Sequence, residues 1–207
     1  MKNTGSLNRY PDRPRELNWL YKEPKKYEEY AYVLDYLPHG RPGAPRTAHT
    51  AAGVIQLLGE EYFTLLEATP NKDAEYNIKD RIYVGKGDRA LVSHVLGRIN
   101  YEDLTSAAKA ELPAVTEAIV QANEARFLEF VNTSPPLTPR MHSLELIPGI
   151  GKRLMFQILE LRERAPFTGF EDLKERVNLT DPVKLIARRV QEELSQEQKY
   201  YLFVRPA

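Results

Sequence analysis

The segment LELIPGIGKRLM, residues 144–155, interrupts two apolar runs with Pro148, Gly149 and Gly151. Proline removes a helical N–H donor and glycine adds backbone freedom, so this composition predicts a sharp turn between two short helices. The first N–H groups of the second helix have no helical partner, and together with the helix dipole they favour an anion. Bare glycine would let a phosphate reach them. The candidate phosphate-binding residues are Gly149, Ile150 and Gly151, with Lys152 and Arg153 as neighbouring cations. A purely structural packing role is the alternative.

Apolar spacing predicts the helices around this turn. Ile150, Leu154, Ile158 and Leu161 form one stripe on the second helix, with Ile150 packed between the two helices. A weaker copy of the pattern follows downstream, where Thr168–Glu171 fits a capping box and Asp181 is expected to cap a helix whose first residue is Pro182. This second turn has no glycines, so it is expected to pack rather than bind. The side chains expected on the outer side of its last helix are Lys184, Arg188 and Arg189.

The first half of the chain has the composition of a small β-structure. Branched and aromatic residues predict strands over residues 27–37, 54–58, 62–68, 81–84 and about 94–101, separated by Gly- and Pro-containing loops. Several short strands without long intervening helices favour a small antiparallel OB-like β-barrel. An exposed sheet of this kind could stack bases on aromatic rings, with cations near the backbone. The candidates are Tyr62, Phe63 and Tyr83, with Arg81, Lys86 and Arg89; core packing of the rings is the alternative.

Helices are expected between this barrel and the Gly-containing turn. Thr105 is a plausible cap for a short helix that ends before Pro113, and Pro113 fits the first turn of a longer helix to about Val131. The predicted fold class is α+β, an OB-like barrel followed by an all-α domain of short helices. The predicted division is a basic N-terminal extension (1–26), the barrel (27–104), a helical connector (105–133) and the helical domain (134–207).

Composition limits the possible functions. The chain has 207 residues, 42% of them hydrophobic and 28% charged, which is typical of a soluble globular protein. We expect a cytoplasmic protein, since no membrane span or signal-peptide core is evident. The absence of cysteine excludes disulfides, thiolate catalysis and Cys-type zinc sites. The formal net charge is zero, but residues 1–26 carry an excess of basic side chains. That stretch is either a solvated tail or an arm attracted to phosphate.

Catalytic patterns are absent from the sequence. The acidic pairs, such as Glu60–Glu61 and Glu192–Glu193, are sequence neighbours whose side chains diverge. The histidines His39, His49, His94 and His142 show no metal-ligand spacing and are expected to be polar groups of loops. We therefore expect no enzyme, no cofactor and no metal. Arg140, just before the first short helix, is a further candidate for contact with a phosphate.

The segment LELIPGIGKRLM resembles the helix-hairpin-helix motif, which binds the sugar-phosphate backbone of nucleic acid without reading bases. The resemblance implies backbone contacts from Gly149, Ile150 and Gly151. Met155 departs from the motif, in which a small residue is common at this position. Further segments resemble an archaeal family of uncharacterised, predicted RNA-binding proteins with an OB-like barrel and a helix-hairpin-helix domain. They are VLDYLPHGRP (33–42), GEEYFTLLE (59–67), YVGKG (83–87), ELP (111–113), RMHSLELIPGIGK (140–152) and KYYLFV (199–204).

Together these patterns favour a non-catalytic protein that binds nucleic acid, RNA more than DNA, through backbone phosphates. One alternative is a protein-interaction adaptor in a ribonucleoprotein or translation assembly. Another is a nuclease or modifying enzyme that uses the hairpin to hold its substrate. No membrane partner is expected.

Overall fold

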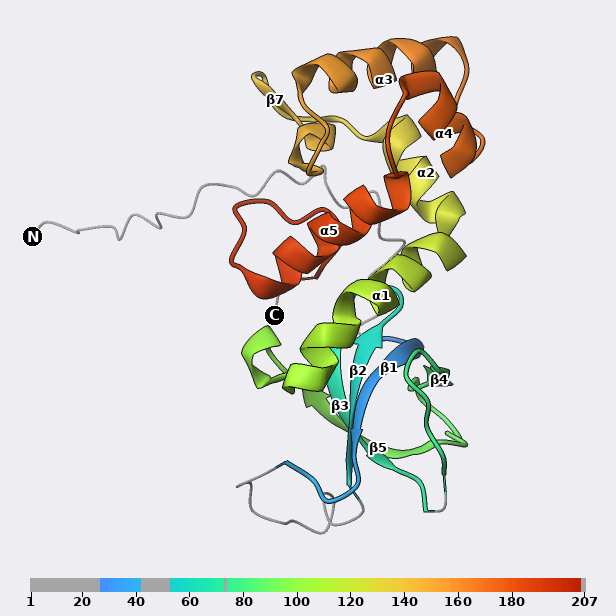
Figure 1. Ribbon diagram of the computed structural model, residues 1–207, viewed down its shortest axis with the longest axis vertical. Coiled ribbons are helices and arrows are strands. Elements are labelled where there is room, and N and C mark those ends of the chain that lie inside the picture. The colour runs from blue at the N-terminus through green and yellow to red at the C-terminus, as the bar shows by residue number, and fades with distance from the viewer. Residues whose placement is uncertain (1–26, 42–52, 73, 206–207) are drawn as a thin grey trace, which may run out of the picture.

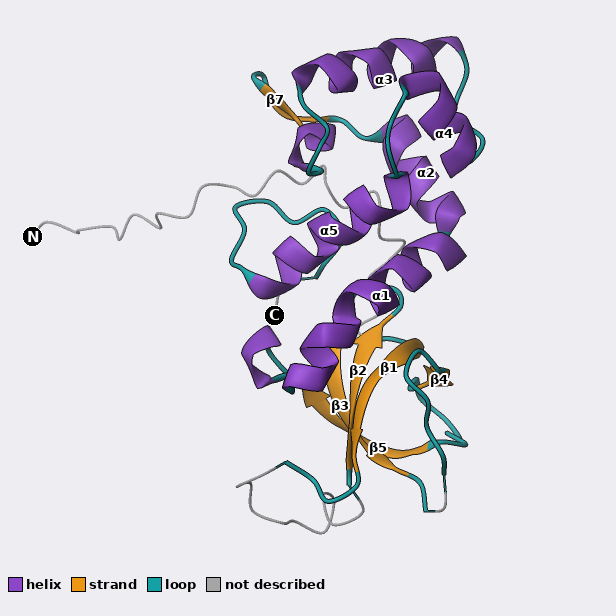
Figure 2. Cartoon of the chain, in the orientation of Figure 1, coloured by secondary structure: helices purple, strands orange, loops and turns teal. Residues whose placement is uncertain are grey.

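The computed structural model describes residues 27–41, 53–72 and 74–205, which form an α+β structure (Figure 1, Figure 2). The main sheet contains β1 (Tyr30–Leu37), β2 (Val54–Gly59), β3 (Leu65–Pro70), β4 (Arg81–Tyr83) and β5 (Val92–Arg98). The α-helices are α1 (Ser106–Ala122), α2 (Glu124–Thr133), α3 (Lys152–Arg164), α4 (Phe170–Val177) and α5 (Pro182–Ser195). The short elements are the strands β6 (Pro136–Thr138) and β7 (Met141–His142) and the 3₁₀ helices η2 (Tyr101–Asp103) and η3 (Ser143–Leu146). The predicted extension 1–26 and His49 lie outside the described residues.

The main sheet is antiparallel and curled, with the strand order β4-β1-β2-β3-β5. Alternate residues of β1 enter different cores. Ala31 and Val33 join an apolar cluster drawn from all five strands, whereas Tyr32 and Leu34 join a second cluster that includes α1. Every residue of β2 and β3 is buried. The central strands are therefore covered on both faces, and the sheet offers no exposed central surface.

Tyr62 and Phe63 lie in the connection between β2 and β3, because β3 begins only at Leu65. Their exposed fractions are 1% and 0%. The prediction that they lie on an exposed sheet is therefore wrong, and neither ring can stack on a base. The cause is remote in sequence: the buried carboxylate of Glu28 accepts the N–H groups of Glu61 (2.9 Å), Tyr62 (3.0 Å) and Thr64 (3.1 Å). These bonds turn the chain inward at this point.

Helix α1 runs through Pro113, so the prediction that a helix ends before this residue is wrong. Thr105 does cap the helix, since its hydroxyl accepts the N–H of Ala108 at 2.9 Å. Proline in a helix interior leaves the carbonyl four residues earlier, that of Lys109, without its helical donor. Burial of apolar side chains on both sides of the proline offsets this loss. Those side chains are Ala108, Leu112, Val115 and Ile119. The break comes at Asn123 instead, between α1 and α2.

One apolar cluster joins the outer side of the sheet to all the α-helices. Helix α1 packs on β1, β2 and α5, and so forms the middle layer of the molecule (Figure 1). The C-terminal segment adds Phe203, whose ring centroid lies 5.4 Å from that of Phe127 and 5.1 Å from that of Phe130. The predicted connector 105–133 thus lies inside a continuous core.

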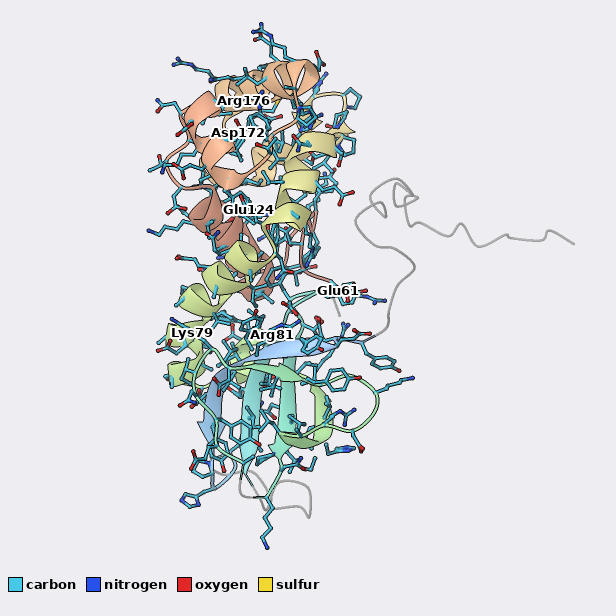
Figure 3. The ribbon with its side chains drawn as sticks, turned by 90° about the vertical axis from the view of Figure 1, so that its right-hand side faces the viewer. Glu61, Lys79, Arg81, Glu124, Asp172 and Arg176 are labelled. Carbon is cyan, nitrogen blue, oxygen red and sulfur yellow. The ribbon has the colours of Figure 1, made fainter. Side chains whose placement is uncertain are left out.

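The caps of α4 and α5 follow different rules. Asp181 accepts the N–H of Lys184 at 3.2 Å, and Pro182 opens α5, as predicted. The predicted capping box at Thr168 is wrong, because the cap of α4 is Gly169. The first N–H of α4, that of Phe170, donates to the carboxylate of Glu124 on α2. Figure 3 labels Glu124. A neighbouring helix therefore replaces a local cap.

The predicted outer position of Arg189 is also wrong. Arg189 is 5% exposed and pairs with Glu193, whose carboxylate is equally shielded, at 2.8 Å. Lys184 and Arg188 do lie on the exposed side. No helix in the described part of the chain is long and apolar enough to cross a membrane.

Candidate functional site

The corner, Pro148–Gly151, joins the 3₁₀ helix η3 to α3. The short helix predicted before the corner is a single four-residue 3₁₀ helix. The side chain of Ile150 is 4% exposed and packs inward as predicted. Its N–H donates to the carbonyl of Ile147 at 3.0 Å, so this N–H, one of the predicted phosphate contacts, is already used within the corner. Gly149 has a φ of +92°, a conformation that L side chains rarely adopt. A Cβ on Gly149 would lie 3.1 Å from a methyl group of Leu185, which places the corner against α5.

Gly151 is the cap of α3, and its environment differs from that of Gly149. Its φ is −80°, and a Cβ at this position would meet nothing within 4 Å. Neither backbone geometry nor packing therefore requires glycine here. No side chain of the described residues caps α3, although Ser, Asp or Asn would stabilise this position more than glycine does. The exposed backbone at Gly151 leaves the first N–H groups of α3 open to a ligand.

Three exposed cations accompany the corner. Lys152 and Arg153 open α3, and Arg140 occupies the turn between β6 and β7. The 3₁₀ helix η3 contacts both β7 and α3, so it links the two cationic segments. Within the described ranges, none of the three has a carboxylate at ion-pairing distance. The corner therefore combines unpaired N–H groups with uncompensated positive charge, an arrangement suited to an oxyanion.

His142 fixes the entry to the corner. The ring Nδ1 of His142 accepts the backbone N–H of Leu144 at 3.1 Å. The backbone N–H of His142 donates to the carboxylate of Glu145 at 2.8 Å, and the two bonds together cap η3. The sequence predicted only a polar group of a loop at this position. Burial lowers the pKa of His142, and the nearby guanidinium of Arg162 lowers it further. The imidazole is thus held in its neutral form, which the Nδ1 bond requires.

The free energy of unfolding is expected to decrease as the pH is lowered, because of the titration of His142. The unfolded imidazole titrates near 6.5 and the folded one below this value, so the unfolded chain binds more protons between the two. The stabilisation is complete above about pH 6.5 and is lost as the pH falls through the folded pKa. Urea unfolding at several pH values would measure this loss. His142→Asn retains a capping oxygen without a titrating ring, so its stability should depend less on pH.

Burial raises the pKa of the Glu28 and Glu193 carboxyls. Their contribution to the free energy of unfolding therefore increases as the pH is lowered, opposite to that of His142. The informative quantity is therefore the difference between the wild-type and His142→Asn curves. Parallel curves would contradict the assignment to His142.

The remaining candidates lie elsewhere. Tyr83 is half-buried, and its hydroxyl donates to the Lys86 carbonyl at 2.7 Å, while Arg89 donates to the Gly85 carbonyl at 2.7 Å. Arg81 forms an ion pair with Glu60 at 2.7 Å. Lys86 is exposed, 5.0 Å from the ring of Tyr27. These residues stabilise the β4–β5 region, at the opposite end of the long axis from α3 (Figure 1). The structure does not bring them to the corner.

Among the described residues, no group of three or more His, Asp or Glu side chains is placed to hold a metal ion. Residues 27–205 match the model of a family described as "Protein of unknown function (DUF655)". This chain belongs to DUF655. The match includes the corner and leaves out the basic extension.

Two relatives of this DUF655 protein have similar sequences throughout. The "Uncharacterized protein MJ0038" of Methanocaldococcus jannaschii is 44% identical over 185 residues, which cover 88% of this chain and 82% of the relative. The crystal structure of Af1531 from Archaeoglobus fulgidus has a TM-score of 0.79 and 44% identity, and the match covers 86% of this chain and 100% of that one. The resemblance to an archaeal family of uncharacterised proteins is thus confirmed.

Proposed function

We propose that this DUF655 protein is a non-catalytic, cytoplasmic protein that binds RNA through backbone phosphates at the corner. The bare Gly151 supports this proposal most directly, because the fold itself has no need of glycine there. The corner and its flanking helices are interpreted as a helix-hairpin-helix. The curled sheet, with β4 and β5 at its edges, is interpreted as a partly open OB-like barrel.

The small number of cations at the corner favours contact with a few RNA phosphates over contact with a long stretch of backbone. The formal net charge is zero, and three exposed cations surround the corner. Such a site fits a few phosphates of a loop or single strand better than an extended duplex. Unpaired loops and bulges are the parts of RNA that proteins most often recognise.

The adaptor alternative has one observation in its favour. Phe156 on α3 is 64% exposed, one helical turn beyond Lys152 and Arg153. An exposed ring can contribute to a protein interface. If the protein is an adaptor, Phe156→Ser should weaken partner capture, while RNA affinity stays negligible and insensitive to salt.

The proposed function is tested by the salt dependence of RNA binding. If about three phosphates are engaged, the affinity for single-stranded RNA should fall about 20-fold between 50 and 200 mM salt. The double variant Lys152→Glu with Arg153→Glu should remove most of the binding and flatten the salt dependence. Fluorescence anisotropy with a labelled mixed-sequence RNA measures both quantities.

A matched control is the double variant Arg164→Glu with Lys174→Glu. It changes the net charge by the same amount, at exposed positions on the far end of α3 and on α4. Its affinity should stay close to that of the wild type. Equal losses in the two double variants would contradict a phosphate site at the corner and indicate a response to overall charge only.

A further inference from the structure

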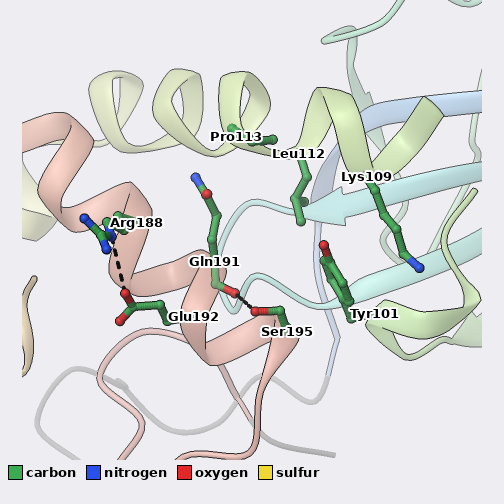
Figure 4. Close-up of a pocket in the computed structure, with 8 residues that line it drawn as sticks. All are labelled: Tyr101, Lys109, Leu112, Pro113, Arg188, Gln191, Glu192 and Ser195. Atoms are coloured by element: carbon green, nitrogen blue, oxygen red, sulfur yellow. Dashed lines mark hydrogen bonds and ion pairs between the residues drawn. The ribbon is translucent and has the colours of Figure 1, made fainter. Parts of the chain in front are cut away.

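A pocket of about 250 Å³ lies between η2, α1 and α5 (Figure 4). None of its lining residues belongs to the corner. Its α5 wall contains Arg188, Gln191 and Ser195, and its α1 wall contains Lys109 and Pro113. Tyr101 of η2 supplies an aromatic ring. We propose that this α1–α5 pocket receives one unstacked base of a single-stranded RNA whose backbone lies at the corner. This inference rests on the proposed function and names its substrate as single-stranded RNA.

The size of the pocket favours a base over a larger ligand. Pockets for drug-sized molecules and cofactors usually span roughly 300–1,000 Å³. At about 250 Å³ the pocket lies below that range, which suits one planar ring system and not a whole dinucleotide.

The polar groups of the pocket suit the edge of a base. Gln191 extends from α5 toward Pro113 (Figure 4), and its side-chain amide has no hydrogen-bond partner in the described part of the chain. An amide offers both a donor and an acceptor, as the edges of bases do. The Lys109 ammonium lies over the Tyr101 ring, 5.0 Å from its centroid. The ring is an aromatic surface of the kind on which single-stranded bases stack, and we propose that the base stacks on it beside this cation.

The charged side chains that line the pocket are Lys109, Arg188 and Glu192. Glu192 also lines the pocket and lies 3.4 Å from the guanidinium of Arg188. Its carboxylate can accept a hydrogen bond from an amino group of a base. The guanidinium plane of Arg188, whose side chain is 69% exposed, remains available at the rim.

A stripe of two exposed and two half-buried side chains runs along α5 from the corner to the pocket. Gly149 of the corner faces Leu185, and the neighbouring Lys184 begins a series on α5 with spacings of four, three and four residues: Lys184, Arg188, Gln191 and Ser195. Such spacing places side chains on one face of a helix. From Leu185 to Gln191 the helix rises about 9 Å, since each residue adds about 1.5 Å. This rise is the part of the path that lies along α5, and a strand covers it in about three stacked nucleotides at about 3.4 Å each.

Binding of one short mixed-sequence RNA, single-stranded or as a duplex, tests the proposal. Tyr101→Ala and Gln191→Ala should each weaken binding of the single strand, Tyr101→Ala by about 5- to 150-fold, the factor that corresponds to stacking one base. Duplex binding should not change, because a paired base cannot enter the pocket. Tyr101→Phe, which keeps the ring, and Gln196→Ala, an exposed glutamine outside the pocket, serve as matched controls and should bind like the wild type.

The possible outcomes separate the two proposals. If the corner double variant loses binding while Tyr101→Ala and Gln191→Ala bind the single strand normally, the pocket proposal is wrong and the proposed function stands. If the wild type binds neither RNA, both are wrong. Because Tyr101 also packs against the core, thermal melting must accompany its variant. If Tyr101→Ala melts early and Gln191→Ala binds normally, the pocket proposal is overturned as well.

Discussion

Glu193→Ala is expected to lower the free energy of unfolding by about 3–5 kcal/mol, because it leaves the guanidinium of Arg189 buried without its charged partner. The carboxylate of Glu193 accepts four bonds, from Arg189 (2.8 Å) and from the N–H groups of Leu202 (2.7 Å), Phe203 (3.0 Å) and Val204 (2.8 Å). Burial raises the pKa of this carboxyl, and these donors counteract the rise. Losing them also releases the C-terminal segment, and with it the contacts of Phe203 in the core. Chemical denaturation would measure the effect.

The neighbouring residue provides the control. Glu192 also pairs with an arginine four residues earlier, Arg188, but this pair is exposed, with side-chain exposures of 34% and 69%. Exposed pairs contribute about 0.2–1 kcal/mol, so Glu192→Ala should cost little. Equal losses at the two positions would show that the burial of the Arg189–Glu193 pair is not the cause.

Gly151→Asp is expected to reduce RNA affinity roughly 100-fold while the melting temperature stays the same or rises slightly. An aspartate cap would accept the first N–H groups of α3, stabilise the helix by a few tenths of a kcal/mol relative to glycine, and repel a phosphate. The fold can accommodate the side chain, since a Cβ at this position meets nothing within 4 Å. Anisotropy titrations and thermal melts of one preparation would test both expectations.

Gly151→Asn separates the two causes of this loss, because asparagine occupies the same N–H groups without a negative charge. We expect it to bind with intermediate affinity. Substitution of Gly149 would be less informative, because it would also destabilise the fold. The φ of Gly149 is +92°, and a Cβ there would lie close to Leu185. Normal RNA binding by Gly151→Asp would argue against phosphate contact at the corner.

Local patterns predicted the structure where local forces determine it. The Asp181–Pro182 start of α5 and the turn at the corner follow from capping and from backbone geometry, which involve only near neighbours in sequence. Pro113 was misleading because the core on which α1 packs stabilises a helix that the local sequence disfavours. Arg189 was misleading because a pair four residues apart occurs equally on exposed helices. The returning C-terminal segment, whose Tyr200 carbonyl accepts a bond from the Arg189 guanidinium, helps to bury it.

Longer-range features could not be predicted from one sequence. Tyr62 and Phe63 turn inward because of Glu28, which is more than thirty positions away along the chain. The α1–α5 pocket combines residues from three elements between Tyr101 and Ser195, and no spacing within any one of them indicates the others. The accessibility of the corner is likewise a property of its surroundings, whereas its glycines could be read directly.

The contacts of Tyr62 have a consequence for the path of the chain. Its N–H donates to Glu28 at 3.0 Å, and its carbonyl accepts the N–H of Arg205 at 3.2 Å, so one residue bridges positions close to both limits of the family match. The polypeptide between them is therefore almost a closed ring. A short linker from residue 205 to residue 27 could complete this ring without rearranging the core, which makes the protein a natural scaffold for circular permutation.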